Sequence, residues 1–440
     1  MASKRLVKQS NKKAKARLTH LTSLTFIVLV IKLILVARSN QSTWLGADGE
    51  SFIANAGIIS KEGFFSSNAS LMYFAGGYSF LLFLLNIFGT TALPYLVILI
   101  QTASYSFAVW VLTRQLLKLP ISAIAIPFAY ISLLNPTLSL SSLQIGYESP
   151  VATIFIAVVA LLLIDLSQES VKKLKWPFLL GSGLLGFTAF LQPKFILSGL
   201  AVLIIWTIAR KPSKATALVM ALSILSFAVL PASLSIRSQV AVGSWIPASS
   251  LGNVAAFGAG PNATGHGSTD TGLVCDTTGL SPESASNAKF KCAVKWYLTN
   301  PMPAAELIAS KSVMFWSPWA GPLAEGSQGR NLYNRFHPVL EMVQSQEGYD
   351  FVAGPFGRFL AWTWLLGGLF VLFLGFYSLW KVNRVTRYLG SSAMTIVLTS
   401  WLIAAGTQGD HRYRVPIMGM SLLLQISGWN FMFKKAKVIS

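Results

Sequence analysis

The sequence predicts an all-α, polytopic membrane protein with about ten spanning helices, surface helices in a first outer loop, and a larger outer loop region. Three observations predict this class. Hydrophobic residues make up 53% of the chain and charged residues only 11%, with a mean hydropathy of +0.58, whereas a soluble protein needs far more charge on its surface. The apolar residues fall in runs of roughly 16–23, the length that crosses a bilayer core of about 30 Å. The basic residues lie in short clusters between these runs.

The positive-inside rule decides how the runs are laid across the membrane. An apolar segment at 72–89 is long enough to be an eleventh span, but counting it would put Arg114 and Lys118, and the two clusters that follow them, outside. We therefore predict that 72–89 lies on the outer membrane surface. The ten predicted spans are 21–38, 93–113, 120–138, 149–166, 177–192, 195–209, 215–235, 359–380, 388–407 and 415–433.

This arrangement places both termini in the cytoplasm. It puts 21 of the 35 Lys and Arg residues on the inner side and 13 of the 15 acidic residues on the outer side. No small-residue cleavage site follows the first apolar run, so we expect that run to stay as a helix in a multi-pass protein of the plasma (cytoplasmic) membrane. The expected regions are a disordered basic tail at 1–20, an N-terminal transmembrane region at 21–235 containing the first outer loop at 39–92, an outer loop region at 236–357, and a C-terminal transmembrane region at 358–440.

The net charge of +20 does not indicate nucleic-acid binding here, because the basic clusters are explained by membrane orientation. The chain has no GxxxxGK[ST], GxSxG or HExxH motif, which are typical of phosphate-loop, hydrolase and zinc-protease sites. The four histidines are dispersed, so we predict no metal site, although a divalent metal shared by acidic residues stays open. No motif in the sequence indicates another cofactor.

Three acidic residues lie near predicted outer ends of spans. Asp48 and Glu50 follow the first span, and Glu148 begins the fourth. An acidic residue in a loop is often only solvated, and one at a helix N-terminus complements the helix dipole. A carboxylate held within reach of a hydroxyl can also act as a general base. These three residues are therefore the candidate catalytic groups.

Basic side chains also lie at outer span ends, where the positive-inside rule disfavours them. Lys194 separates the fifth and sixth spans, Arg237 follows the seventh, and Arg412 and Arg414 follow the ninth beside His411. Such side chains can simply extend to the membrane surface. Four cations with acids nearby can also hold an anion such as a lipid phosphate.

Both cysteines, Cys275 and Cys292, lie in the 236–357 region. Two cysteines on the oxidising side of a membrane can pair, the alternative being two unpaired thiols. They are close in sequence, so closing the loop between them costs little entropy. We predict a disulfide between them.

Several motifs occur in an order that resembles a known family. In the first outer loop Asp48 is followed four residues later by Phe52, then by a small-residue segment that ends at Gly63. Next comes FAGGYSFLLFLLNIFG, which contains Tyr78. The segment SLSSLQIGYESPVATIF then carries Glu148 at the start of a span.

The match continues through ASLSIRSQVAVGSWIP, which carries Arg237 out of a span, through KWYLTNPMPAAELIASKSVMFW, and through HRYRVPIMG before the last span. With these motifs the chain resembles, over nearly its whole length, the C-type polyprenyl-phosphate-dependent membrane glycosyltransferases. The nearest branch includes protein O-mannosyltransferases and bacterial lipid A aminoarabinose transferases. The chain has Gln192-Pro193 where that family often has Arg-Pro.

The resemblance implies transfer of a hexosyl or pentosyl group from a polyprenyl-phosphate donor to a hydroxyl of a protein, lipid or glycan, at the outer face and with inversion. Its partners would then be the donor, the acceptor and membrane lipids. The alternative class is a transporter or flippase of a lipid-linked or anionic solute, but transporters usually place their sites near the midplane and show repeats. The implied roles are catalysis for Asp48, Glu50 and Glu148, donor-phosphate binding for Lys194, Arg237, Arg412 and Arg414, and proximity to substrate for Tyr78, Tyr147 and His411.

Overall fold

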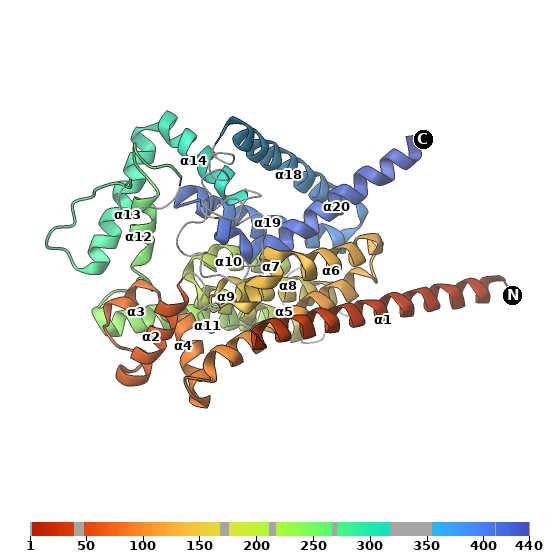
Figure 1. Ribbon diagram of the computed structural model, residues 1–440, viewed down its shortest axis with the longest axis horizontal. Helices are drawn as coiled ribbons and strands as arrows, with labels where there is room; N and C mark the ends of the chain where they lie inside the picture. The colour runs from red at the N-terminus through yellow and green to blue at the C-terminus, as the bar shows by residue number, and fades with distance from the viewer. Residues whose placement is uncertain are drawn as a thin grey trace.

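The computed structural model describes residues 2–38, 48–167, 176–210, 217–265, 271–316, 354–409 and 411–439, and within them it is helical with no extended strand. Figure 1 shows the helices in chain order. Their bounds are α1 Ala2–Ala37, α2 Gly49–Glu62, α3 Ala69–Tyr73, α4 Gly77–Leu85, η2 Asn86–Phe88, α5 Leu93–Leu116, η3 Ser122–Ile124, α6 Ala125–Leu134, α7 Pro136–Leu140, η4 Ser141–Leu143, α8 Glu148–Leu166, α9 Trp176–Leu191, η5 Pro193–Phe195, α10 Ile196–Ala209, α11 Ala217–Val242, α12 Ser250–Phe257, α13 Pro282–Thr299, α14 Pro301–Trp316, α18 Pro355–Val382, α19 Arg384–Gly406, η8 His411–Arg414 and α20 Val415–Ile439.

Six described helices are long and apolar enough to cross a membrane. They lie in α1, α5, α8, α11, α18 and α19. A seventh span results if the bent pair Ser122–Leu134 and Thr137–Leu143 is counted as one, while Trp176–Leu191 and Pro193–Ala209 are shorter apolar helices. Each of the ten predicted spans therefore falls on a helix or a bent helix pair, and the all-α membrane class is supported. The number ten is not confirmed.

The N-terminal tail differs from our expectation. We expected residues 1–20 to be disordered, but α1 already begins at Ala2. Alanine, lysine and arginine, which together make up half of this tail, have high helix propensity, so the helix of the first span continues into it.

The helix α8 forms the centre of the bundle. Of its most apolar window 78% is buried, against 22% for the corresponding windows of α1 and α11. Glycines allow the closest helix contacts: a Cβ on Gly186 of α9 would lie 2.1 Å from the Phe227 carbonyl oxygen of α11, and one on Gly375 of α18 would lie 1.8 Å from the Leu424 carbonyl oxygen of α20. Small residues play this part in membrane helix pairs because lipid offers no hydrophobic drive for association.

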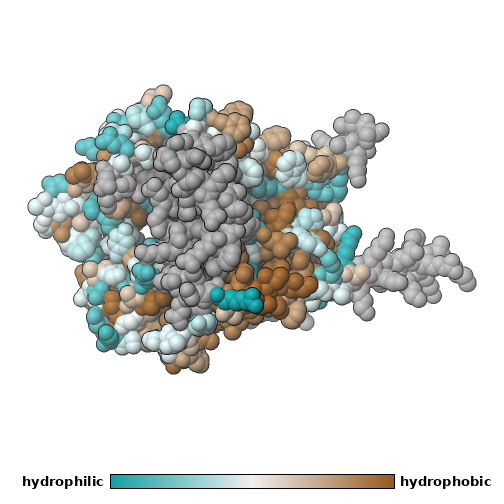
Figure 2. Space-filling view, viewed as in Figure 1, coloured by the Kyte–Doolittle hydropathy of each residue, from teal (hydrophilic) through white to brown (hydrophobic). Residues whose placement is uncertain are grey.

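Both chain termini lie at one end of the bundle, and α2, α3, α12 and α13 lie at the opposite end (Figure 1). Hydrophobic side chains gather on the visible face over the middle of the bundle, with more polar residues toward its ends (Figure 2). Termini at one end agree with an even number of crossings, and the apolar middle agrees with helices that lie in a bilayer. We refer to the end that carries α2, α12 and α13 as the loop end.

The segment 72–89 is broken in the structure. It contains the end of α3, the helix α4 and the short η2, and the apolar helix Gly77–Phe88 is shorter than a spanning helix. At a rise of 1.5 Å per residue it cannot cross a core of about 30 Å. This agrees with the prediction that it does not form a span.

The charge distribution predicts which introduced cysteines can be labelled from outside the cell. A cysteine introduced at Ser284 in α13 should react with a membrane-impermeant maleimide in intact cells, whereas one at Ser167, after α8, should react only after the membrane is permeabilised. Both positions are exposed, so accessibility in the protein itself is matched. Labelling at Ser167 in intact cells would contradict the ten-span arrangement.

Candidate functional site

A carboxylate and a guanidinium from distant parts of the sequence meet at the loop end. Asp48 directly precedes α2 as its N-cap, and Arg412 lies in η8. The Arg412 Nη2 atom lies 3.2 Å from Asp48 Oδ2, with the two side chains 15% and 29% exposed. The pair is therefore reachable by a ligand and is not buried in the core.

An aromatic cluster fixes the position of α2. The Phe52 backbone N–H donates to the Asp48 carbonyl in the first turn, at 3.0 Å. The buried Phe52 ring contacts the rings of Phe74, Tyr78 and Tyr147 at centroid distances of 5.4, 5.0 and 6.1 Å. The spacing of Asp48 and Phe52 thus has a physical reason, because the aromatic anchors the turn that presents the carboxylate.

Lys194 is held by aromatic side chains. Its Nζ donates to the Tyr147 hydroxyl at 2.9 Å and lies 3.8 Å from the centre of the Tyr413 ring and 5.3 Å from that of Phe195. Cation–π contacts of this kind stabilise a charged ammonium. They bring Lys194, from the connection between α9 and α10, beside the residue that follows Arg412.

Glu148 completes the group. It is the first residue of α8, and its carboxylate interacts electrostatically with Arg412, Asp48 and Lys194. The carboxylate folds back over Gly146, where a Cβ would come within 2.6 Å of Glu148 Oε2. We refer to Asp48, Glu148, Lys194 and Arg412 as the charged cluster.

Two tyrosines at this cluster were not assigned from the sequence. Burial raises the pKa of the Tyr73 phenol, Tyr413 and Asp48 add to the rise, and Arg412 opposes it, so Tyr73 lies within electrostatic reach of the ion pair as a neutral phenol. The Tyr413 hydroxyl accepts a hydrogen bond from Gln408 Nε2 at 2.5 Å. The Lys194 Nζ atom lies over the Tyr413 ring. Tyr413 lies inside the family-like motif HRYRVPIMG, whereas Tyr73 directly precedes the motif that begins at Phe74.

Arg237 does not join the charged cluster. Its side chain is completely buried and donates to the carbonyl oxygens of Phe64, Ser66 and Leu71 at 2.7, 3.0 and 3.3 Å. These contacts tie the chain after α2 to α11. The placement does not support the expectation that Arg237 binds a phosphate, and it gives this residue a role in folding the first outer loop.

The other predicted residues fall around the cluster. Arg414 is buried and donates to the Trp316 carbonyl at 2.8 Å, which joins η8 to α14. Tyr78 is buried and its hydroxyl accepts from Gln101 at 3.3 Å. Glu50 is exposed on the first turn of α2. The side chain of His411 lies outside the described residues.

The predicted disulfide is confirmed. Cys275 and Cys292 are bonded, with their Cα atoms 6.3 Å apart. The bond joins the chain before α13 to the middle of that helix, and α12 packs against α13. It therefore ties the segment before α13 to that helix; residues 266–270 and 317–353 of the 236–357 region lie outside the described residues.

A buried lysine supports the segment that carries Arg412. The Lys311 side chain, on α14, is fully buried, and its Nζ donates to the Tyr297 hydroxyl and to the Thr407 carbonyl at the end of α19. The Tyr297 hydroxyl donates in turn to the Gly258 carbonyl at 3.3 Å. Burial lowers the pKa of Lys311 to about 7.

The lowered pKa of Lys311 gives a stability profile that can be measured. In the unfolded chain a lysine titrates near pH 10.4, so between about pH 7 and pH 10 the unfolded state holds a proton that the folded state lacks. Raising the pH through this window therefore increases stability, by up to about 1.4 kcal/mol per pH unit. We expect the thermal unfolding midpoint in detergent to rise between pH 7 and 9.5, and to rise less in Lys311→Met. Lys295→Met, on the exposed side of α13, is the control and should keep the wild-type slope.

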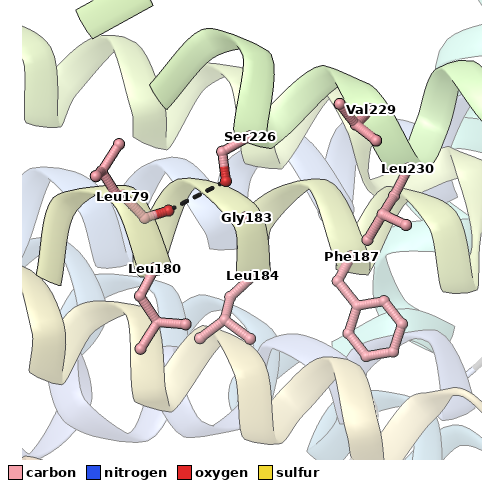
Figure 3. Close-up of a pocket in the computed structure, with 8 residues that line it drawn as sticks. All are labelled: Leu179, Leu180, Gly183, Leu184, Phe187, Ser226, Val229 and Leu230. Carbon is pink, nitrogen blue, oxygen red and sulfur yellow. Dashed lines mark hydrogen bonds between the residues drawn. The ribbon is translucent and has the colours of Figure 1, made fainter. Parts of the chain in front are cut away.

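An apolar groove lies between α9 and α11. It has a volume of about 450 Å³ and is lined by Leu179, Leu180, Gly183, Leu184, Phe187, Ser226, Val229 and Leu230, which project from the two neighbouring helices (Figure 3). Ser226 Oγ donates to the Leu179 carbonyl at 3.3 Å, and a Cβ on Gly183 would lie 2.8 Å from that hydroxyl oxygen. The surface of the groove is therefore hydrocarbon, and its one hydroxyl group, that of Ser226, is already hydrogen-bonded within the protein.

Among the described residues no three His, Cys, Asp or Glu side chains come together as a metal site would require. No protein-family model matches the chain, and no curated protein is significantly similar to it in sequence. The function proposed for the site therefore depends on the residues of the charged cluster.

Proposed function

We propose that the protein is a membrane glycosyltransferase. It moves a sugar from a polyprenyl-phosphate donor to a hydroxyl acceptor at the outer face of the membrane. The observation that carries the proposal is the charged cluster, in which two carboxylates and two cations from four separate segments meet at the loop end. The resemblance of the motifs around Asp48, Glu148 and Arg412 to the polyprenyl-phosphate-dependent family adds to it.

The two kinds of charge match the two needs of glycosyl transfer. An Asp48 carboxylate oxygen takes the proton from the acceptor hydroxyl. The hydroxyl oxygen then bonds to the anomeric carbon as the bond from that carbon to the phosphate oxygen breaks, which inverts the anomeric centre. The departing lipid phosphate gains negative charge, and in this proposal Arg412 and Lys194 supply the positive charge that stabilises it.

Glu148 has a supporting part in this scheme. Its carboxylate lies among Asp48, Lys194 and Arg412 and balances the two cations when no phosphate is bound. Asp48 is the better candidate for the base because it is 29% exposed and can meet an incoming acceptor. Tyr73 and Tyr147 add phenol groups at the edge of the cluster.

The apolar groove suits the lipid part of the donor. Its lining is hydrocarbon, and it lies on α9, the helix that leads directly to Lys194. An isoprenoid tail can lie against this surface while its phosphate reaches the charged cluster. The size and apolar character of the groove support this placement, because burying methylene groups is worth about 0.8 kcal/mol each.

The proposal is tested with purified protein in liposomes and radiolabelled polyprenyl-phosphate sugars. Release of the free lipid phosphate, dependent on an added hydroxyl acceptor, is the expected result. Passage of intact donor across the bilayer without cleavage would instead identify a transporter or flippase and would overturn the proposal. Donors with mannosyl, glucosyl and arabinosyl groups, tried in parallel, identify the sugar.

A further inference from the structure

A lysine lies inside the first spanning helix, away from the charged cluster. Lys32 falls within the membrane-crossing part of α1, and its side chain is only 2% exposed. An ionisable residue inside a spanning helix is costly to insert into a membrane. The chemistry proposed above makes no use of this residue, so its burial needs another reason.

The contacts of Lys32 point to one short segment. Its Nζ donates to Ser142 Oγ at 3.0 Å and lies 4.7 Å from the centre of the Tyr105 ring. The Ser142 hydroxyl itself donates to the Ser139 carbonyl at 2.9 Å. Its lone pairs therefore need donors from elsewhere, and the Lys32 amino group supplies one of them.

The helix α5 holds the same segment from the other side. Thr102 Oγ1 donates to the Ser142 carbonyl at 3.3 Å, and Gln101 Nε2 donates to the Gln144 carbonyl at 3.2 Å. Gln101 also donates to the Tyr78 hydroxyl. The stretch from Ser142 to Gln144 is thus held by polar contacts from two spanning helices.

This stretch leads directly into the charged cluster. After η4 the chain leaves the helical conformation at Gln144, with φ −119° and ψ 148°, and re-enters a helix at Glu148. Between them lies Tyr147, which accepts from Lys194. A shift of 142–147 therefore moves both the Glu148 carboxylate and the Tyr147 hydroxyl relative to Lys194 and Arg412.

We infer that Lys32 is a positioning residue for the site: its amino group clamps Ser142 and, with Thr102 and Gln101, sets where Tyr147 and Glu148 lie. The role in catalysis rests on the proposed function, whereas the clamp does not. Small displacements matter, because a shift of about 1 Å in a catalytic array costs roughly 100-fold in rate.

The test uses full-length protein in nanodiscs with the variants Lys32→Met, Lys32→Arg, Ser142→Ala and the double variant Lys32→Met/Ser142→Ala. The control is Ile31→Met, at a neighbouring exposed position of α1. Hydrogen exchange of peptides covering 141–150 is the first readout. We expect exchange there to be at least tenfold faster in Lys32→Met than in wild type and in Ile31→Met, with exchange in α8 beyond residue 155 unchanged. Unchanged exchange at 141–150 overturns the clamp.

Glycosyl transfer is the second readout. We expect Lys32→Met to lower kcat about 10- to 100-fold with KM for the donor within about threefold, Lys32→Arg to recover part of the loss by restoring a donor, and the loss in the double variant to be less than the product of the two single losses. Full activity of Lys32→Met overturns the positioning role. If wild type transfers no sugar while exchange at 141–150 still responds to Lys32→Met, the proposed function has failed and the clamp stands. Should Lys32→Met fail to fold, Ser142→Ala and Thr102→Val test the same contacts from the other partners.

Discussion

Asp48→Asn is expected to lower turnover by roughly 10²–10⁴-fold with donor binding nearly unchanged. The amide keeps the size and polarity of the carboxylate but cannot accept the proton of the acceptor hydroxyl. The measurement is the steady-state rate of lipid-phosphate release in liposomes, together with donor affinity from equilibrium binding. Because Asp48 is paired with Arg412 at 3.2 Å, the melting temperature should be recorded as well, to separate lost chemistry from lost folding.

Glu50→Gln is the matched control for Asp48→Asn. Glu50 lies two residues further along the chain, on the first turn of α2, and is exposed, so its substitution should leave turnover within about twofold of wild type. If Glu50→Gln abolishes turnover while Asp48→Asn stays active, the wrong carboxylate was chosen. If both keep full activity, Glu148→Gln becomes the next variant to measure.

Arg412→Gln is expected to weaken donor binding and to reduce turnover by roughly 10²–10³-fold. The phosphate is present in the bound donor and in the transition state, so loss of the guanidinium affects both, and more charge develops as the bond breaks. Lys194→Met should act in the same direction. Isothermal titration with polyprenyl phosphate, the leaving product, measures the binding part directly.

Arg237→Met separates phosphate binding from folding. The guanidinium of Arg237 is buried and bonded to three backbone carbonyls, which lose their donors in the variant. We expect a lower unfolding midpoint, since unsatisfied buried polar groups cost about 1–3 kcal/mol each, with little change in affinity for polyprenyl phosphate in the protein that remains folded. If Arg237→Met is as stable as wild type but has lost its affinity for polyprenyl phosphate, Arg237 binds the phosphate after all.

The sequence predicted the helices well because hydropathy and charge act through short-range rules. Each predicted span lies on a helix or a bent pair, and the disulfide followed from two cysteines in one compartment. The predicted spans 177–192 and 195–209 also lie on helices, but these helices, Trp176–Leu191 and Pro193–Ala209, are shorter than the six that are long enough to cross a membrane.

Side-chain partners were harder to predict because they depend on long-range packing. Asp48, Glu148, Lys194 and Arg412 were all candidates, yet the 3.2 Å contact between Asp48 and Arg412 joins residues at opposite ends of the chain. Arg237 has the same residue type and the same kind of sequence position as Arg412, and only the fold distinguishes a buried clamp from an accessible cation.

The buried lysines were missed for the same reason. Nothing in the local sequence around Lys32 or Lys311 shows which hydroxyl or carbonyl each one reaches, since Ser142 and Thr407 are distant in the chain. Lys32 occurs as a single charge in an apolar run, and such a residue is a marker for a functional or structural contact inside a membrane.

The apolar groove between α9 and α11 has a consequence for how the transfer rate should depend on donor concentration. Several of its lining side chains, such as Leu180 and Val229, are about half exposed, so the groove is open along its side and a lipid can enter from the bilayer without passing through water. Under the proposed function, a donor that enters this way diffuses in two dimensions, and its effective concentration is its mole fraction among the lipids. At a fixed bulk amount of donor, diluting it with inert phospholipid should slow transfer in proportion once the donor is below saturation, whereas adding buffer volume should leave the rate per protein unchanged.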